Sequence, residues 1–450
     1  MNRRTFLRAA GVAGILGASG CATPFDSLGG SGQNGSSNGS GSDGSNGSAG
    51  MGGSSGSNGS NDSTGTTTSP ATATPEAPST RSGAALAGVY PGGPDFASNL
   101  APLTEWLGQP PAVALLFVDA LGPTENKRRF VEGPLTNVWE AGHVPMISWQ
   151  PFVPERQQTS EAIEREIAEG EYDDQLAEWA SLLESWARPR GDQTRGRRFY
   201  FRPAHEMNGS WFPWSAVDSS RIESTPVPVE DTGNATGGEN PTAGTPQDYV
   251  EMWRRLYDAF DETDLDETDV QWVWAVNAEQ VPSYLQTERY YPGDEYVDWV
   301  GIDGFNRGGT ESYSSWQSPT QLFDPMLGRL RELTDKPMAL TEFASTSVVG
   351  GEGGTEPRPA RKAEWIESAF TYVEENDIKM TCWFNVDKTG VDEADWAIFG
   401  GERGTGQVSA SGTQYAAYEA YKRSVSRDGF LSALPDYPPL LTDDEFAGEF

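Results

Sequence analysis

Short apolar runs alternate with longer amphipathic segments along the chain from residue 87 onward. The runs are rich in β-branched and aromatic residues, which is typical of buried strands. They occupy residues 87–92, 112–119, 144–151, 198–206, 270–277, 298–305, 337–343 and 378–385. Strands that alternate with helices favour a parallel sheet.

The segments between these runs have helical periodicity. Residues 172–187 place Leu176, Trp179 and Leu183 on one face, and residues 245–260 open on a Thr-Pro cap. Two further helices are predicted at 361–376 and 413–424. About eight strand–helix units over roughly 340 residues predict an α/β fold, a (β/α)8 TIM barrel spanning residues 83–425. An open doubly wound sheet is the alternative, but no glycine-rich phosphate loop follows the first strand.

Polar and tryptophan residues cluster where the predicted strands end. In a barrel these carboxyl-terminal ends share one face, where active sites are built. The residues concerned are Asp119, Trp149, Glu206, Asn277, Asp303, Glu342 and Trp383.

Glu206 and Glu342 are the candidate catalytic residues. Two carboxylates at the ends of different strands can flank one glycosidic bond, with one acting as nucleophile and the other as acid/base. His205, beside Glu206, can orient such a site. A zinc site of the His-Glu-x-x-His type is disfavoured because the only other histidine, His143, is far upstream. We expect no metal and no cofactor.

Tryptophans near the strand ends strengthen the interpretation as a carbohydrate site. Trp149, Trp211, Trp214 and Trp383 lie at or just beyond these ends. Exposed aromatic rings at the rim of a barrel would stack on the apolar faces of sugar rings. We therefore expect these residues to form platforms for substrate.

Three motifs resemble glycoside hydrolase family 26 over residues 87–421. They are "FRPAHEMNGSWFPW" (201–214), "YPGDEYVDWVGIDGF" (291–305) and "KPMALTEFAS" (336–345). The resemblance implies a (β/α)8 retaining enzyme from a family of β-mannanases that includes mixed-linkage β-1,3-1,4-glucanases and β-1,3-xylanases. It implies an endo-β-glycosidase acting on a β-1,4-mannan-type polysaccharide, with the glucan and xylan specificities as alternatives.

The resemblance also implies roles for individual residues. Glu206 would be the acid/base and Glu342 the nucleophile. His205 and Arg202 would support the carboxylates, Trp211 would line the leaving-group side, and Trp383 would form the floor under the attacked sugar. Trp149 and Asp303 are further substrate-binding candidates. The family usually has a tyrosine where this chain has Phe305.

The substitution at Phe305 keeps a second class of function open. A tyrosine hydroxyl at this position can reach the nucleophile, and phenylalanine lacks it. A non-catalytic carbohydrate-binding surface protein is therefore the alternative from another class.

Charge narrows the range of partners. The chain has 66 acidic and 32 basic residues, a net charge of −34 and a sequence pI near 4.3. Such an excess repels nucleic acid and anionic polymers, so a neutral β-linked polysaccharide is the expected partner. The few lysines and the acidity resemble proteins of high-salt organisms. We expect a monomer.

The N-terminal region predicts export. "MNRRTFLRAAGVAGILGASGC" (1–21) resembles a twin-arginine signal that ends at a lipidated Cys21; a plain signal peptide is the alternative. Residues 22–82 are rich in Gly, Ser and Asn and predict a disordered linker. These features predict an extracellular domain held to the membrane only by a lipid anchor. Residues 426–450 are expected to form an acidic C-terminal tail.

Overall fold

The computed structural model describes residues 78–93, 95–188, 196–216, 243–281, 286–311, 313–351, 354–391 and 393–450. The predicted signal with Cys21 and nearly all of the predicted linker lie outside these residues.

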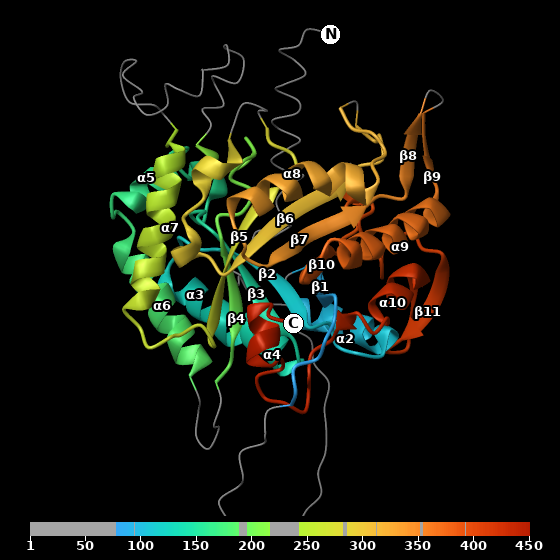
Figure 1. The fold of residues 1–450 in the computed structure, drawn as a ribbon, viewed down its shortest axis with the longest axis horizontal. Coiled ribbons are helices and arrows are strands. Elements are labelled where there is room, and N and C mark those ends of the chain that lie inside the picture. Colours follow the sequence, from blue (N-terminus) through green and yellow to red (C-terminus); the bar gives the residue numbers. More distant parts are fainter. Residues whose placement is uncertain are drawn as a thin grey trace, which may run out of the picture. The chain divides into compact units, whose positions relative to one another are not determined.

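Eight parallel strands close into a barrel (Figure 1). Each strand pairs with its neighbour, and β1 pairs with β10 to complete the circle. The strands are β1 (Ala85–Tyr90), β2 (Val113–Asp119), β3 (Val144–Gln150), β4 (Phe199–Pro203), β5 (Val270–Asn277), β6 (Trp299–Asn306), β7 (Met338–Ser345) and β10 (Met380–Phe384). The predicted (β/α)8 barrel is confirmed, and the open sheet is excluded.

Helices surround the barrel and bury its outer face. They are α2 (Phe96–Leu107), α3 (Thr124–Phe130), the π-helix η1 (Val131–Leu135), α4 (Thr136–Glu140), α5 (Ile163–Ala168), α6 (Asp173–Ala187), α7 (Pro246–Asp261), α8 (Pro319–Leu333), α9 (Pro359–Glu375) and α10 (Glu419–Val425). The predicted helices at 172–187, 245–260 and 361–376 are confirmed. Helix α7 begins at a capping box between Thr245 and Asp248, and buries Tyr249, Trp253 and Leu256.

Two antiparallel hairpins are added to the barrel. Strands β8 (Val348–Gly351) and β9 (Gly354–Pro357) form one, and β11 (Gly406–Ala410) and β12 (Thr413–Ala417) form the other. The second hairpin corrects the helix predicted at 413–424, which begins only at Glu419. Ser411 and Gly412 both have positive φ, 47° and 74°, as a tight two-residue hairpin turn requires.

The C-terminal residues belong to the barrel domain, which corrects the expectation of a separate tail at 426–450. Strand β13 (Phe430–Leu431) pairs with the start of β1, and α11 (Asp443–Ala447) follows. The Phe446 ring lies 4.7 Å from the ring of Tyr200, and its carbonyl accepts hydrogen bonds from Tyr200 and Trp299. This segment therefore closes the amino-terminal end of the barrel, because Tyr200 and Trp299 stand at the beginning of β4 and β6.

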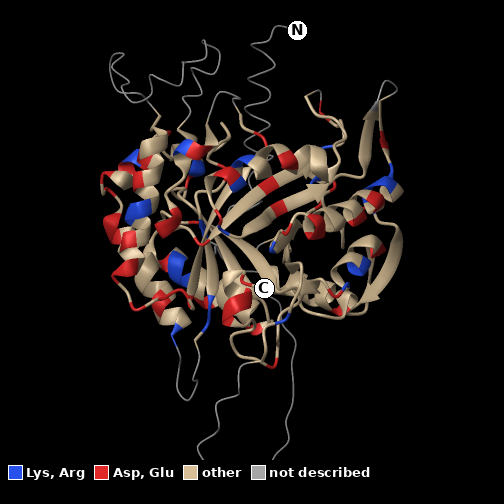
Figure 2. Ribbon diagram, viewed as in Figure 1, with Lys and Arg blue, Asp and Glu red and all other residues tan. Residues whose placement is uncertain are grey.

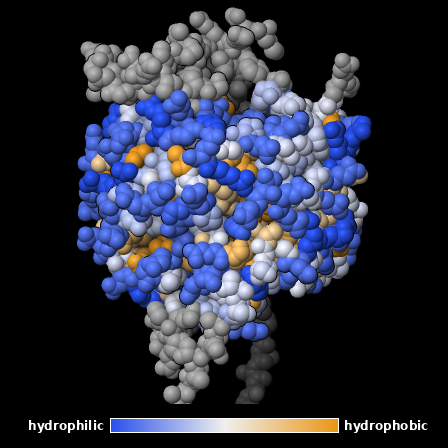
Figure 3. Space-filling view, viewed as in Figure 1, coloured by the Kyte–Doolittle hydropathy of each residue, from blue (hydrophilic) through white to orange (hydrophobic). Residues whose placement is uncertain are grey.

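Acidic residues are spread over the surrounding helices (Figure 2), and the face in view is mainly hydrophilic (Figure 3). In the described part of the chain, no helix is both long and apolar enough to span a bilayer.

Candidate active site

Strand β4 and the turn after it place three charged or polar side chains at the mouth of the barrel. Alternation along the strand turns Phe201 outward onto Phe260 and Trp272, and turns Arg202 into the interior. Beyond the strand, Ala204 and Glu206 have φ values of 42° and 54°. Left-handed backbone is costly for residues other than glycine and clusters at functional sites. This turn brings both His205 and Glu206 into the buried centre.

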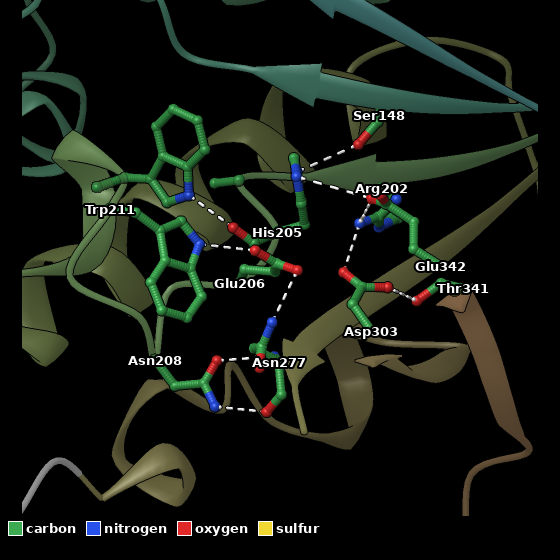
Figure 4. Close-up of polar contacts among 12 residues, drawn as sticks. Ser148, Arg202, His205, Glu206, Asn208, Trp211, Asn277, Asp303, Thr341 and Glu342 are labelled. Carbon is green, nitrogen blue, oxygen red and sulfur yellow. Dashed lines mark hydrogen bonds and ion pairs between the residues drawn. The ribbon is translucent and has the colours of Figure 1, made fainter. Parts of the chain in front are cut away.

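The carboxylate of Glu206 accepts two hydrogen bonds. Trp211 Nε1 donates to Oε2 at 2.6 Å, and Asn277 Nδ2 donates to Oε1 at 2.9 Å (Figure 4). Burial raises the pKa of Glu206 to about 7, helped by the charge of Asp303 and opposed by these two donors. A carboxyl group with this pKa is partly protonated at neutral pH.

Asn208 holds the Asn277 donor in place. Its Oδ1 accepts from the backbone N–H of Asn277 and its Nδ2 donates to the Asn277 carbonyl, both at 2.8 Å. This pair of bonds ties the end of β5 to the turn after β4. The amide that contacts Glu206 is therefore positioned before any substrate arrives.

Arg202 joins the other two carboxylates. Its Nη2 lies 2.6 Å from Asp303 Oδ2 and 2.5 Å from Glu342 Oε1, and all three side chains are buried (Figure 4). Thr341 donates to the second oxygen of Asp303 at 2.6 Å. The guanidinium therefore stands between two carboxylates at the ends of β6 and β7.

A bulge in β7 aims Glu342 at the site. Ile302 pairs with Leu340 and Asp303 with Glu342, so Thr341 is one extra residue on β7. The β7–β10 pairing is irregular over the same stretch. Bulges redirect side chains and are frequent beside active sites. This one lets the consecutive residues Thr341 and Glu342 both contact groups inside the barrel.

Burial and the Arg202 charge both act on the pKa values of Glu342 and His205. Burial and the negative charges of Asp303 and Glu206 raise the pKa of Glu342, and Arg202 opposes that rise through direct contact. Burial and the Arg202 charge lower the pKa of His205 well below its usual range, so the imidazole is neutral at pH 7. Its Nδ1 lies 3.2 Å from Ser148 Oγ and its Nε2 lies 3.9 Å from Glu342 Oε1.

Six of the predicted site residues lie together in this network: Arg202, His205, Glu206, Trp211, Asp303 and Glu342. Phe305, two residues beyond Asp303, is also at the mouth, with its ring 5.5 Å from Phe384 and 5.2 Å from Trp396. The hydrogen bond to the Glu342 carboxylate comes from Arg202, so that carboxylate is held without a tyrosine at position 305.

The expectation of exposed platforms is wrong for Trp149, Trp214 and Trp383, which are fully buried. Trp383 packs outward against Phe343, Trp365 and Tyr421 in the layer under α9 and α10. Strand alternation likewise turns Trp149 away from the interior, because its neighbour Ser148 contacts His205. On β3 and β10, the side chains that face the barrel interior are therefore one residue away from the predicted Trp149 and Trp383.

Sequence reasoning missed several contributors. Ser148, Asn208, Thr341 and Trp396 were not singled out, although Asn277 was noted as a strand-end polar residue. Strand alternation counted from the inward Gln150 would have identified Ser148. Within the residues that the structure describes, no group of three or more His, Cys, Asp or Glu side chains could hold a metal ion.

Comparisons with known proteins find similarity to glycoside hydrolases. Residues 149–336 match the family model described as glycosyl hydrolase family 26. Glu342 lies just beyond the matched segment. Endoglucanase H of Acetivibrio thermocellus is 29% identical over 264 residues, which cover 58% of this chain and 23% of that protein. Mannan endo-1,4-beta-mannosidase A and B of Caldalkalibacillus mannanilyticus is 27% identical over 175 residues, 38% of this chain and 27% of that protein.

The chain thus spans about a quarter of the length of these two relatives. Among solved structures, the catalytic domain of the Bacillus sp. JAMB-750 GH26 endo-beta-1,4-mannanase is similar in fold, with a TM-score of 0.50 and 16% identity. That match covers 77% of this chain and 83% of the other.

Proposed function

We propose that this chain is a retaining endo-β-glycosidase that cleaves β-1,4-mannan-type polysaccharide, and the match of residues 149–336 to the glycosyl hydrolase family 26 model supports this proposal. Glu206 is the acid/base and Glu342 the nucleophile in this proposal. The observation that carries it is the difference between the partners of the two carboxyl groups. Glu206 accepts hydrogen bonds from the neutral donors Trp211 and Asn277, whereas Glu342 is in direct contact with the Arg202 guanidinium.

In the first step, a carboxylate oxygen of Glu342 attacks the anomeric carbon of the sugar. The bond from that carbon to the glycosidic oxygen breaks, and Glu206 gives its proton to the departing oxygen. Arg202 favours the ionised form of the nucleophile by its charge, and the neutral His205 beside it contributes no net charge. The products are a shortened polymer and a glycosyl ester of Glu342.

In the second step, Glu206 is a carboxylate and removes a proton from water. The water oxygen attacks the anomeric carbon, the ester bond breaks, and Glu342 returns to its ionised form. Two displacements at one carbon retain its configuration. The donors Trp211 and Asn277 stabilise the charged form of Glu206 that this step requires.

Mixed-linkage β-1,3-1,4-glucan is the second candidate substrate. The observation that favours it is the match to Endoglucanase H, which is longer and of higher identity than the mannosidase match. Discrimination between mannose and glucose depends on one axial hydroxyl. Reducing-sugar release from galactomannan, glucomannan, lichenan and β-1,3-xylan tests which polymer is cleaved.

The roles of the two glutamates are tested by alanine variants. Glu342→Ala should abolish turnover of every substrate, because no ester can form. Glu206→Ala should be severely slow on polysaccharide and yet form the ester from an aryl glycoside with a good leaving group. Azide should then accelerate release of the Glu206→Ala ester as a β-glycosyl azide, because azide needs no general base.

The wild-type products, followed by NMR, should keep the β configuration. Inverted products, or azide rescue with the opposite assignment of the two glutamates, would refute the proposed roles. Retention of polymer without any release of reducing sugar by the wild type would favour the non-catalytic carbohydrate-binding alternative.

A further inference from the structure

A second polar cluster lies at the barrel mouth on the side of β2 and β3. Asp119 and Gln150 are the last residues of these strands and pair with each other in register. Arg156, from the short helix η2 (Arg156–Gln158), reaches both. Its Nε and Nη2 donate to Asp119 Oδ2 and Oδ1 at 2.7 and 2.5 Å, and Nη2 also donates to Gln150 Oε1 at 3.2 Å.

This cluster stands one layer above the catalytic network. Gln150 follows Ser148 by two residues on the same face of β3, and Ser148 contacts His205. Asp119 follows Phe117 by two residues on β2, and the Phe117 ring lies 5.6 Å from the His205 ring. The positive charge of Arg156 adds to the burial and the Arg202 charge that lower the pKa of His205.

The cluster has unused hydrogen-bonding capacity. Gln150 is fully buried, and its Nε2 has no hydrogen-bond partner among the described residues. An unpaired buried amide donor is costly, so it requires an explanation. The side chains of Asp119 and Arg156 are 26% and 22% exposed, so a ligand can reach them. Each Asp119 oxygen accepts one bond from Arg156 and retains further acceptor capacity.

Packing and hydrogen bonds hold the side chains of this cluster in place before a ligand binds. The Arg156 guanidinium lies 4.4 Å from the centre of the Phe152 ring, which packs edge-on against Trp214 at 4.9 Å. Two parallel hydrogen bonds add a defined orientation to the ion pair. A ligand therefore meets donors and acceptors whose conformational entropy has already been lost, which favours binding.

We propose that Asp119, Gln150 and Arg156 form a sugar-binding subsite that recognises neighbouring hydroxyl groups of one unit of the polysaccharide. The carboxylate accepts from one hydroxyl, and the Gln150 amide donates to the next. The unit lies beside the one attacked by Glu342, so the subsite selects substrate by its hydroxyl arrangement. This inference rests on the proposed function for its ligand class.

The test compares Asp119→Asn and Gln150→Leu with wild type on oligosaccharides of three to six β-1,4-linked mannose units. In wild type, kcat/KM should rise at the length that first fills the subsite. Each variant should lose about 10- to 100-fold at that length, because one hydrogen bond to the sugar is lost. For the shortest oligosaccharide that is cleaved, kcat/KM should change less than threefold.

A matched control is Arg329→Met, which breaks a similar bidentate pair with Glu288 at 2.6 and 2.7 Å. It should leave the length dependence unchanged. Equal losses at every length, or the same loss in the control, would overturn the subsite.

Calorimetric titration with the same oligosaccharides separates this inference from the proposed function, because binding needs no turnover. If wild type fails to hydrolyse but binds, and Asp119→Asn weakens binding at least tenfold, the subsite stands and the catalytic proposal falls. If wild type hydrolyses and the variant binds equally, the subsite falls alone.

Discussion

At the scale of single residues, the protonation state of Glu206 depends on contacts that shift its pKa in opposite directions. Burial and the Asp303 charge favour its neutral form, whereas Trp211 and Asn277 donate to its charged form. The balance leaves the pKa at about 7. A general acid near this value can give up a proton and recover it at working pH.

The Trp211→Phe variant tests this balance through the pH dependence of kcat/KM. In wild type, kcat/KM should fall as pH rises through about 7, because the proton on Glu206 is lost. Removal of the Trp211 N–H destabilises the charged form and raises the pKa. The alkaline limb should therefore move upward by about one pH unit, since one unit corresponds to roughly 1.4 kcal/mol.

Trp214→Phe is the control for this shift. It removes an indole N–H that donates at 2.8 Å to the backbone carbonyl of His205 and not to a carboxylate. Its alkaline limb should stay where the wild-type limb lies. A downward shift in Trp211→Phe, or equal shifts in both variants, would contradict the assignment.

At the scale of elements, periodicity predicted the strands and their ends, but not always which face a residue takes. Glu206 and Glu342 were found because strand ends of a barrel meet at one face. Trp149 and Trp383 were placed wrongly because a one-residue change of register turns a side chain to the opposite side. The bulge at Thr341 depends on pairing with strands that are distant in sequence, so no local sequence pattern predicts it.

The C-terminal segment was misjudged for a related reason. Its acidic residues suggested a solvated tail, but a few apolar residues dock it on the barrel. Phe446 is 1% exposed and packs on Tyr200, with the Arg198 guanidinium 4.7 Å from its ring centre. Buried apolar residues, with Phe446 among them, therefore decide the structure of a stretch that also carries many acidic residues.

Phe446→Ala should lower the free energy of unfolding by about 3–5 kcal/mol, because it removes a buried aromatic ring and leaves a cavity. Urea denaturation followed by tryptophan fluorescence measures this change. Glu449→Ala, in the same segment but exposed, should change the value by less than about 0.5 kcal/mol. Equal stability of Phe446→Ala and wild type would show that the segment does not close the barrel.

At the scale of the whole molecule, charge repulsion opposes folding. The net charge of −34 comes from 66 acidic and 32 basic residues, and acidic positions occur on the helices and loops around the barrel (Figure 2). Salt shortens the range of this repulsion, from about 10 Å at 0.1 M to about 3 Å at 1 M. The folded state gains most from screening because it holds the charges closest together.

The midpoint of thermal unfolding at pH 7 should therefore rise by several degrees between 0.1 and 2 M KCl. Near pH 4.3, the sequence pI, net repulsion is small and the same salt step should have much less effect. Differential scanning calorimetry at both pH values measures the two shifts. A midpoint independent of KCl at pH 7, or equal shifts at the two pH values, would count against self-repulsion.

The contacts of Thr80 and Arg81 with α11 determine how the domain is presented to its surroundings. Thr80 and Arg81 bind Asp444 and Glu445 of the helix that closes the amino-terminal end of the barrel. The first described residues and this closing helix therefore stabilise each other at the pole opposite Glu206 and Glu342, which leaves the mouth of the barrel clear of both.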